Sequence, residues 1–142
     1  MQPITVYHRT AQYHETDQMG IIHHANYIKW FEEARTDFLD QIGMGYREME
    51  EADILSPVLS MNCEYKKPVR YGDRVAIHVS IEQFDGCRLA VSYRVEDADT
   101  GELRAQGSSK HCLIDRDFRP IRLQKINPQQ YETLSKWVGV QL

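Results

Sequence analysis

The chain has 142 residues, of which 42% are hydrophobic and 27% are charged. This length fits one domain with its own core, and the composition excludes a disordered chain, a collagen-like rod and a coiled coil. The net charge is −4, from 17 basic and 21 acidic residues. Such a balance argues against general nucleic-acid binding, which needs a concentrated basic face. We therefore expect a single domain over residues 1–142.

The cysteines and histidines give no sign of a metal site. Cys63, Cys87 and Cys112 are widely spaced and form no Cys-x-x-Cys pair, which argues against a disulfide framework and a zinc ribbon. The six histidines include no His-x-His pair and no His-Glu-x-x-His motif. We predict neither a metal nor any other cofactor.

The start of the chain has neither the basic residues nor the apolar run of a signal peptide. No apolar stretch reaches the ~18 residues that a membrane span needs. The cytoplasm is therefore the expected location.

The hydrophobic pattern changes period along the chain. Alternating residues predict a strand over 4–13, and a polar stretch with Gly20 predicts a loop over 14–23. From Ala25 the apolar residues recur at helical spacing, and two glycines, at positions 43 and 45, end this helix. Alternation then predicts four further strands, and Asn127-Pro128 is typical of the start of a last helix, over about 128–138. The four strands are expected at 57–67, 74–84, 88–96 and 102–114, with Asp85-Gly86 as a hairpin turn between the middle two.

One long helix with a wide apolar stripe needs a sheet to cover that stripe. The pattern therefore predicts an α+β domain in which an antiparallel sheet wraps around a long central helix. Such a sheet leaves its edges partly uncovered, so we expect a homo-oligomer.

The loop before the long helix holds the strongest candidate for chemistry. Asp17 precedes the helix, and Gly20 permits a tight turn there. A helix start offers unpaired backbone N–H groups and a positive dipole. A carboxylate that faces such a start suits acyl transfer, because the carboxylate attacks or activates water while the N–H groups hold the developing oxyanion. The alternative is that Asp17 is a simple turn residue.

Several motifs together resemble one family. They are Asp17 with Gly20, the run His24-Ala25-Asn26-Tyr27, the spacing Phe31-x-x-x-Arg35, and Tyr65-x-x-Pro68-x-Arg70-Tyr71-Gly72-Asp73. This pattern resembles the hot-dog-fold acyl-CoA thioesterases of the 4-hydroxybenzoyl-CoA thioesterase family, over about residues 4–116. The resemblance implies the hot-dog fold, hydrolysis of an acyl-CoA to a carboxylic acid and coenzyme A, and a homodimer or homotetramer.

The resemblance also implies roles for individual positions. Asp17 is the implied base or nucleophile, and the backbone N–H of His24 the implied donor to the thioester carbonyl, with Gly20 shaping the loop. Substrate contacts are implied for His23, where some relatives have a tyrosine, and for its neighbours on the helix. These neighbours are Asn26 and Tyr27.

Coenzyme A carries phosphates, so cations are expected near the site. Lys67 and Arg70 flank Pro68 in the downstream motif and are the first candidates. Arg88 is the next candidate. For any one of these side chains, the alternative is a solvated charge on a strand.

Two other functions remain open from the sequence. One is an acyl-thioester hydratase or dehydratase, although its usual histidine-and-acid motif differs from the Asp17 pattern. The other is a non-catalytic module that binds acyl groups or a protein. The sequence also leaves open the acyl group, and whether coenzyme A or a carrier protein bears it.

Overall fold

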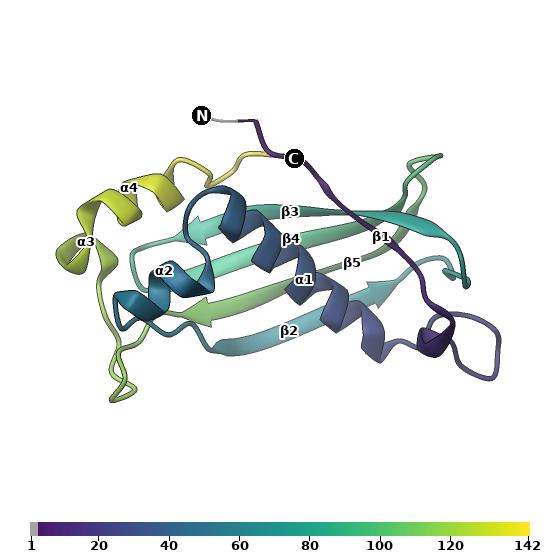
Figure 1. Ribbon diagram of the computed structural model, residues 1–142, viewed down its shortest axis with the longest axis horizontal. Coiled ribbons are helices and arrows are strands. Elements are labelled where there is room, and N and C mark those ends of the chain that lie inside the picture. The colour runs from purple at the N-terminus through teal and green to yellow at the C-terminus, as the bar shows by residue number, and fades with distance from the viewer. Residues whose placement is uncertain (1–2) are drawn as a thin grey trace.

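The computed structural model describes residues 3–142 and contains one five-stranded antiparallel sheet with a long helix across one face (Figure 1). The strand order is β1-β3-β4-β5-β2. This arrangement confirms the predicted α+β class. The elements are β1 (Tyr7–Thr10), the short 3-10 helix η1 (Tyr13–Glu15), α1 (Ala25–Gln41), α2 (Tyr46–Glu51), β2 (Val58–Tyr65), β3 (Arg74–Phe84), β4 (Arg88–Asp97), β5 (Leu103–Cys112), α3 (Leu123–Ile126) and α4 (Pro128–Ser135).

The first strand is shorter than its alternating sequence predicts. β1 pairs with β3 only from Tyr7 to Thr10. The Ala11 N–H instead donates to the carbonyl of Asp73 at 2.8 Å, and the Gly72 N–H donates to the Ala11 carbonyl at 3.0 Å. These bonds hold the chain against the turn before β3, and η1 follows directly. The loop after η1 therefore lies at the end of the sheet where β2 stops and α1 begins (Figure 1).

The apolar face of α1 packs closely on the inner face of the sheet. Trp30 and Phe31 are fully buried, and such side chains each stabilise the fold by about 1.5–3 kcal/mol. The Phe31 ring stacks on Tyr93 of β4, with centroids 4.4 Å apart. A Cβ atom on Gly107 of β5 would lie 2.7 Å from the Phe31 ring. The glycine is therefore what lets this ring approach the sheet.

A buried polar chain, here called the Arg35 network, joins the middle of α1 to the sheet. Arg35 Nη1 donates to the Tyr93 hydroxyl at 2.9 Å, which lies 2.6 Å from Ser109 Oγ. Ser109 Oγ lies 2.7 Å from His111 Nε2. All four side chains are buried. Burial, together with the charge of Arg35, lowers the pKa of His111 to about 4.

The two edges of the sheet differ. β2 forms one edge, where Val58 and Leu59 are exposed. At the other edge, β1 covers only the first part of β3. The C-terminal tail lies along the next part of β3, where the Gly139 N–H donates to the Ile81 carbonyl at 2.8 Å. The segment before β1 and the C-terminal Leu142 lie near each other on that side, where Ile4, Thr5 and Leu142 line one small cavity. Among residues 3–142, no helix is both long and apolar enough to cross a membrane.

Candidate active site

The loop that carries Asp17 is a tight, internally bonded turn. The Asp17 N–H donates to the Ile21 carbonyl at 2.9 Å, and the Gly20 N–H donates to the Asp17 carbonyl at 3.0 Å. Gly20 has φ +78°, a conformation that favours glycine. The Met19 N–H donates to Asp17 Oδ1 at 2.8 Å. One carboxylate oxygen is thus held in place, while Oδ2 has no donor within residues 3–142.

The start of α1 leaves one backbone donor free. The Ala25 N–H donates to His23 Nδ1 at 3.1 Å, and the Asn26 N–H donates to the His23 carbonyl at 3.0 Å. The His24 N–H has no acceptor in the described part of the chain. It therefore remains available at the positive end of the helix dipole, where a negative oxygen is favoured.

Asp17 and His24 line the same groove, which has a volume of about 330 Å³. The Tyr65 hydroxyl of β2 donates to the His24 carbonyl at 2.9 Å, and the Tyr65 and Tyr27 ring centroids lie 5.0 Å apart, edge to face. Burial raises the pKa of both tyrosines to about 12, so both stay protonated near neutral pH. The remaining lining residues are Met19, Ile21, Ile22, Lys66, Lys67 and Pro68.

The predicted residues divide into those in the groove and those beside it. Tyr27 and Lys67 line the groove with Asp17 and His24. The His23 ring stacks on His24 with centroids 4.1 Å apart and also caps α1.

Four predicted substrate contacts, including His23 and Arg88, do not line the groove. The side-chain amide of Asn26 donates to the Glu15 carbonyl at 2.9 Å, which is a bond within the fold. Arg70 is exposed, and its backbone N–H donates to Asp73 Oδ2 at 2.9 Å.

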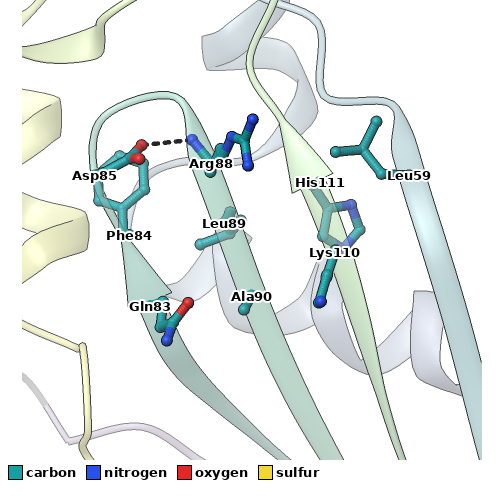
Figure 2. Close-up of a pocket in the computed structure, with 9 residues that line it drawn as sticks. All are labelled: Leu59, Gln83, Phe84, Asp85, Arg88, Leu89, Ala90, Lys110 and His111. Carbon is teal, nitrogen blue, oxygen red and sulfur yellow. Dashed lines mark hydrogen bonds between the residues drawn. The ribbon is translucent and has the colours of Figure 1, made fainter.

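The structure places Arg88 far from Asp17 within one chain. Arg88 pairs with Cys112 on β5, whereas Tyr65 pairs with Ala105. These two β5 positions are seven residues apart, or roughly 23 Å along a strand. Arg88 instead lines a second groove of about 380 Å³ at the β3–β4 turn, together with Lys110 (Figure 2). Within residues 3–142, neither of these two cations forms an ion pair.

Two features near Asp17 were missed at the sequence level. The hydroxyl of Tyr65 contacts the backbone of His24, although the sequence shows Tyr65 only as part of a motif. Glu15 is buried and bonded to several elements. The spacing Gln12-x-x-Glu15 is a capping-box pattern and is the one local signal that could have indicated the buried acid.

A family model described as the thioesterase-like superfamily matches residues 11–138, which span the Asp17 loop, α1 and strands β2 to β5. The chain belongs to this superfamily. The thioesterase shares 38% identity over 127 residues with a Bacillus subtilis (strain 168) protein provisionally named acyl-CoA thioesterase YneP, covering 89% of this chain and 91% of that protein.

Two further relatives are also thioester hydrolases by name. The structure of a DHNA-CoA thioesterase from Staphylococcus aureus has a TM-score of 0.86 and 38% identity, covering 93% of this chain and 89% of that one. The acyl-CoA thioester hydrolase YbgC of Escherichia coli O157:H7 is 27% identical over 123 residues, with coverage of 87% and 88%. These comparisons confirm the predicted hot-dog fold and the predicted activity, which is thioester hydrolysis.

Proposed function

We propose that this thioesterase hydrolyses acyl-CoA esters at the groove formed by the Asp17 loop and the start of α1. One observation carries the proposal: Asp17, whose carboxylate has a free oxygen, and His24, whose backbone N–H is unbonded, line the same groove. Acyl transfer needs these two groups together, because one serves the attack and the other stabilises the charge that the attack creates. The Asp17→Asn variant, described in the Discussion, tests this role.

The reaction follows from these two groups. As a base, Asp17 takes a proton from water while the water oxygen forms a bond to the thioester carbonyl carbon. The carbonyl oxygen becomes an oxyanion that the His24 N–H stabilises, and collapse of this intermediate breaks the carbon–sulfur bond and expels the thiolate. As a nucleophile, Asp17 attacks the thioester carbonyl carbon, the carbon–sulfur bond breaks and the thiolate leaves, which gives a mixed anhydride. Water then hydrolyses this anhydride to the carboxylic acid and the free Asp17 carboxylate. A single turnover in ¹⁸O-labelled water separates the routes, since label found in Asp17 itself requires the anhydride.

The walls of the groove favour a flat acyl group. Tyr27 and Tyr65 present aromatic rings beside Asp17, and Met19 and Pro68 add apolar surface. Aromatic rings prefer edge-to-face or offset contacts with other rings, and the Staphylococcus aureus relative is named for an aromatic thioester. Thiol release across a panel of aryl-CoA and alkyl-CoA esters tests this preference. A change at the 2,3-bond without thiol release would favour the hydratase alternative.

Coenzyme A is the proposed thiol because cations border both grooves. Lys66 and Lys67 lie at the rim of the Asp17 groove, where Lys66 pairs with Glu64 at 3.0 Å and Lys67 lies 3.7 Å from Glu102. Arg88 and Lys110 border the second groove. All are suited to phosphate oxygens.

A homodimer would join the two grooves, and we propose that β2 is its interface. Within residues 3–142 its outer N–H and C=O groups are unpaired, and Val58 and Leu59 are exposed there. Antiparallel pairing of β2 with its copy around a two-fold axis brings the Tyr65 end of one strand beside the Val58 end of the other. The Asp17 groove of one subunit then lies next to the second groove of its neighbour. A tetramer would be a dimer of such dimers.

Subunit mixing tests this arrangement. Asp17→Asn and Arg88→Ala homodimers would each have two defective sites. In the mixed dimer, one site combines the intact Asp17 with the intact Arg88 of the partner subunit. Recovery of activity at low substrate concentration after co-expression supports the shared site. Light scattering that shows a monomer at micromolar concentration would contradict it.

The cytoplasm remains the proposed location. Cys63, Cys87 and Cys112 are all free and half-buried. Unpaired cysteines fit a reducing compartment.

A further inference from the structure

Glu15 lies two residues before Asp17, at the end of η1, and its side chain is buried. Its Oε1 accepts hydrogen bonds from Arg9 Nη1 at 2.8 Å and from the Gln12 N–H at 2.9 Å. Its Oε2 accepts a hydrogen bond from Trp30 Nε1 on α1 at 2.9 Å. The carboxylate is therefore tied to β1, to its own short helix and to the first turns of α1.

The backbone of Glu15 is tied to the start of α1 as well. Its carbonyl accepts hydrogen bonds from the His23 N–H at 2.8 Å and from Asn26 Nδ2 at 2.9 Å. Between these anchors, Thr16 pairs with Ile22. One buried residue thus bonds both to the segment that leads into Asp17 and to the segment that ends at the free N–H of His24.

Glu15 is equipped to hold a position and not to transfer a proton. It is absent from the lining of the Asp17 groove. Burial by itself would raise the pKa of Glu15. The hydrogen bonds from Gln12 and Trp30 and the charge of Arg9 outweigh this effect, so the pKa of Glu15 lies below its ordinary value. The carboxylate stays charged near neutral pH and keeps its three donors in place.

We infer that Glu15 is a positioning residue that fixes the Asp17 carboxylate relative to the His24 N–H. This role, which rests on the proposed catalytic function of Asp17, follows from the bonds of Glu15 to both sides of the loop. A catalytic group misplaced by about 1 Å can lose about 10²-fold in rate. The anchor therefore acts on the chemical step and leaves substrate binding largely unchanged.

The test compares Glu15→Gln with a matched control, Glu33→Gln. Glu33 is the other carboxylate bound to Arg9, at 2.7 Å from Arg9 Nε, and it makes no bond to the Asp17 loop. Both variants remove one charge from the same ion-pair cluster. We expect Glu15→Gln to lower kcat by about 10–100-fold with KM within twofold. Glu33→Gln should keep the wild-type kcat, even where its melting temperature falls.

Two further measurements test whether Glu15 positions Asp17. If Glu15→Gln does not fold, Trp30→Phe removes one donor to the carboxylate and should lower kcat in the same direction. In an Asp17→Asn background, Glu15→Gln should cause a much smaller additional loss, because the group it positions is already disabled. A normal kcat in folded Glu15→Gln, beside an inactive Asp17→Asn, overturns the role of Glu15 alone. An active Asp17→Asn overturns the proposed function.

Discussion

Two buried polar clusters bind the same helix, and they restrain different parts of the molecule. At the first turns of α1, Glu15 joins the helix to the loop that carries Asp17. Near the middle of α1, the Arg35 network joins the helix to the centre of the sheet, through Tyr93 and the two residues beyond it. The first cluster holds a partly exposed loop in place, whereas the second fills the core.

The clusters also differ in how their charge is compensated. Glu15 has the guanidinium of Arg9 at 2.8 Å. Arg35 instead donates to the phenolic oxygen of Tyr93. A buried charge without a counter-ion is costly to the fold, and it acts on the titration of its neighbours. Damage at the helix start should therefore reduce activity, while damage at its middle should change stability and its pH dependence.

The largest expected effect belongs to Asp17→Asn. Asparagine keeps the size of the side chain and the acceptor for the Met19 N–H, but loses basicity and nucleophilicity. We expect kcat to fall about 10²–10⁴-fold, the usual cost of losing a general base. KM should move little, and stability should change by at most about 1 kcal/mol, the value of one turn or cap.

Activity and melting temperature should be measured on the same sample. If Asp17 were only a turn residue, the melting temperature would fall and the folded fraction would keep nearly normal activity. A kcat at or above half of the wild-type value would remove Asp17 from the mechanism. Attention would then turn to His24, which lines the same groove.

The middle cluster predicts a pH effect on stability. The pKa of His111 is about 4 in the folded chain, against an ordinary value of 6.5. Between these values the unfolded chain binds a proton that the folded chain does not, so stability is full above pH 6.5 and falls as the pH drops toward 4. The loss attributable to this one histidine reaches about 3 kcal/mol at pH 4.

Urea titrations of wild type and His111→Gln at a series of pH values check this effect. The difference between the two proteins should change with pH between 4 and 6.5 and stay constant above that range. Arg35→Met should narrow the pH range over which this difference in stability changes, because the charge of Arg35 contributes to the low pKa of His111. A constant difference at every pH would show that His111 titrates normally in the fold.

The smallest effects are expected from the cations at the rims of the grooves. Lys67→Ala and Arg88→Ala each remove an exposed charge, and exposed charge pairs are worth about 0–1 kcal/mol. We expect KM to rise about twofold to fivefold with little change in kcat. The effect should shrink at high salt, because exposed charges are screened. Arg70→Ala, which lies outside both grooves, is a matched control.

If Arg70→Ala raises KM while the other two variants do not, the phosphates of coenzyme A bind beside the Asp73 turn instead. In that case the second groove has no part in substrate binding, and the case for bringing the two grooves together through β2 loses its main support.

The sequence predicts the elements well because they depend on neighbours along the chain. The strands expected at 74–84 and 88–96 are found at Arg74–Phe84 and Arg88–Asp97. Buried residues alternate along β4, whose inner face packs on α1, whereas on β3 residues of both faces are buried. β1 is overestimated because the bonds of Ala11 go to a turn some 60 residues later in the chain, which no local pattern reveals.

The residues of the candidate site also fall into two groups, those that a local motif indicates and those that depend on tertiary packing. Asp17 and His24 are seven residues apart, so a local motif can bring both to notice. The partners of Glu15 come from β1 and from α1, and its burial depends on how these elements pack. The separation of Arg88 from Asp17 depends on strand order. Contacts of this kind follow from tertiary structure and are invisible to spacing along the chain.

The unequal edges of the sheet have a consequence for assembly. A sheet with two long bare edges can add copies at both sides and grow without limit. Here the edge opposite β2 has only the four residues of β1, and the C-terminal tail is bonded along β3 beyond it. Growth is therefore blocked on one side, and the edge pairing proposed through β2 would give a closed pair and not a fibre. Under the proposed β2 pairing, the C-terminal tail would prevent polymerisation, far from the groove where the chemistry is proposed to occur.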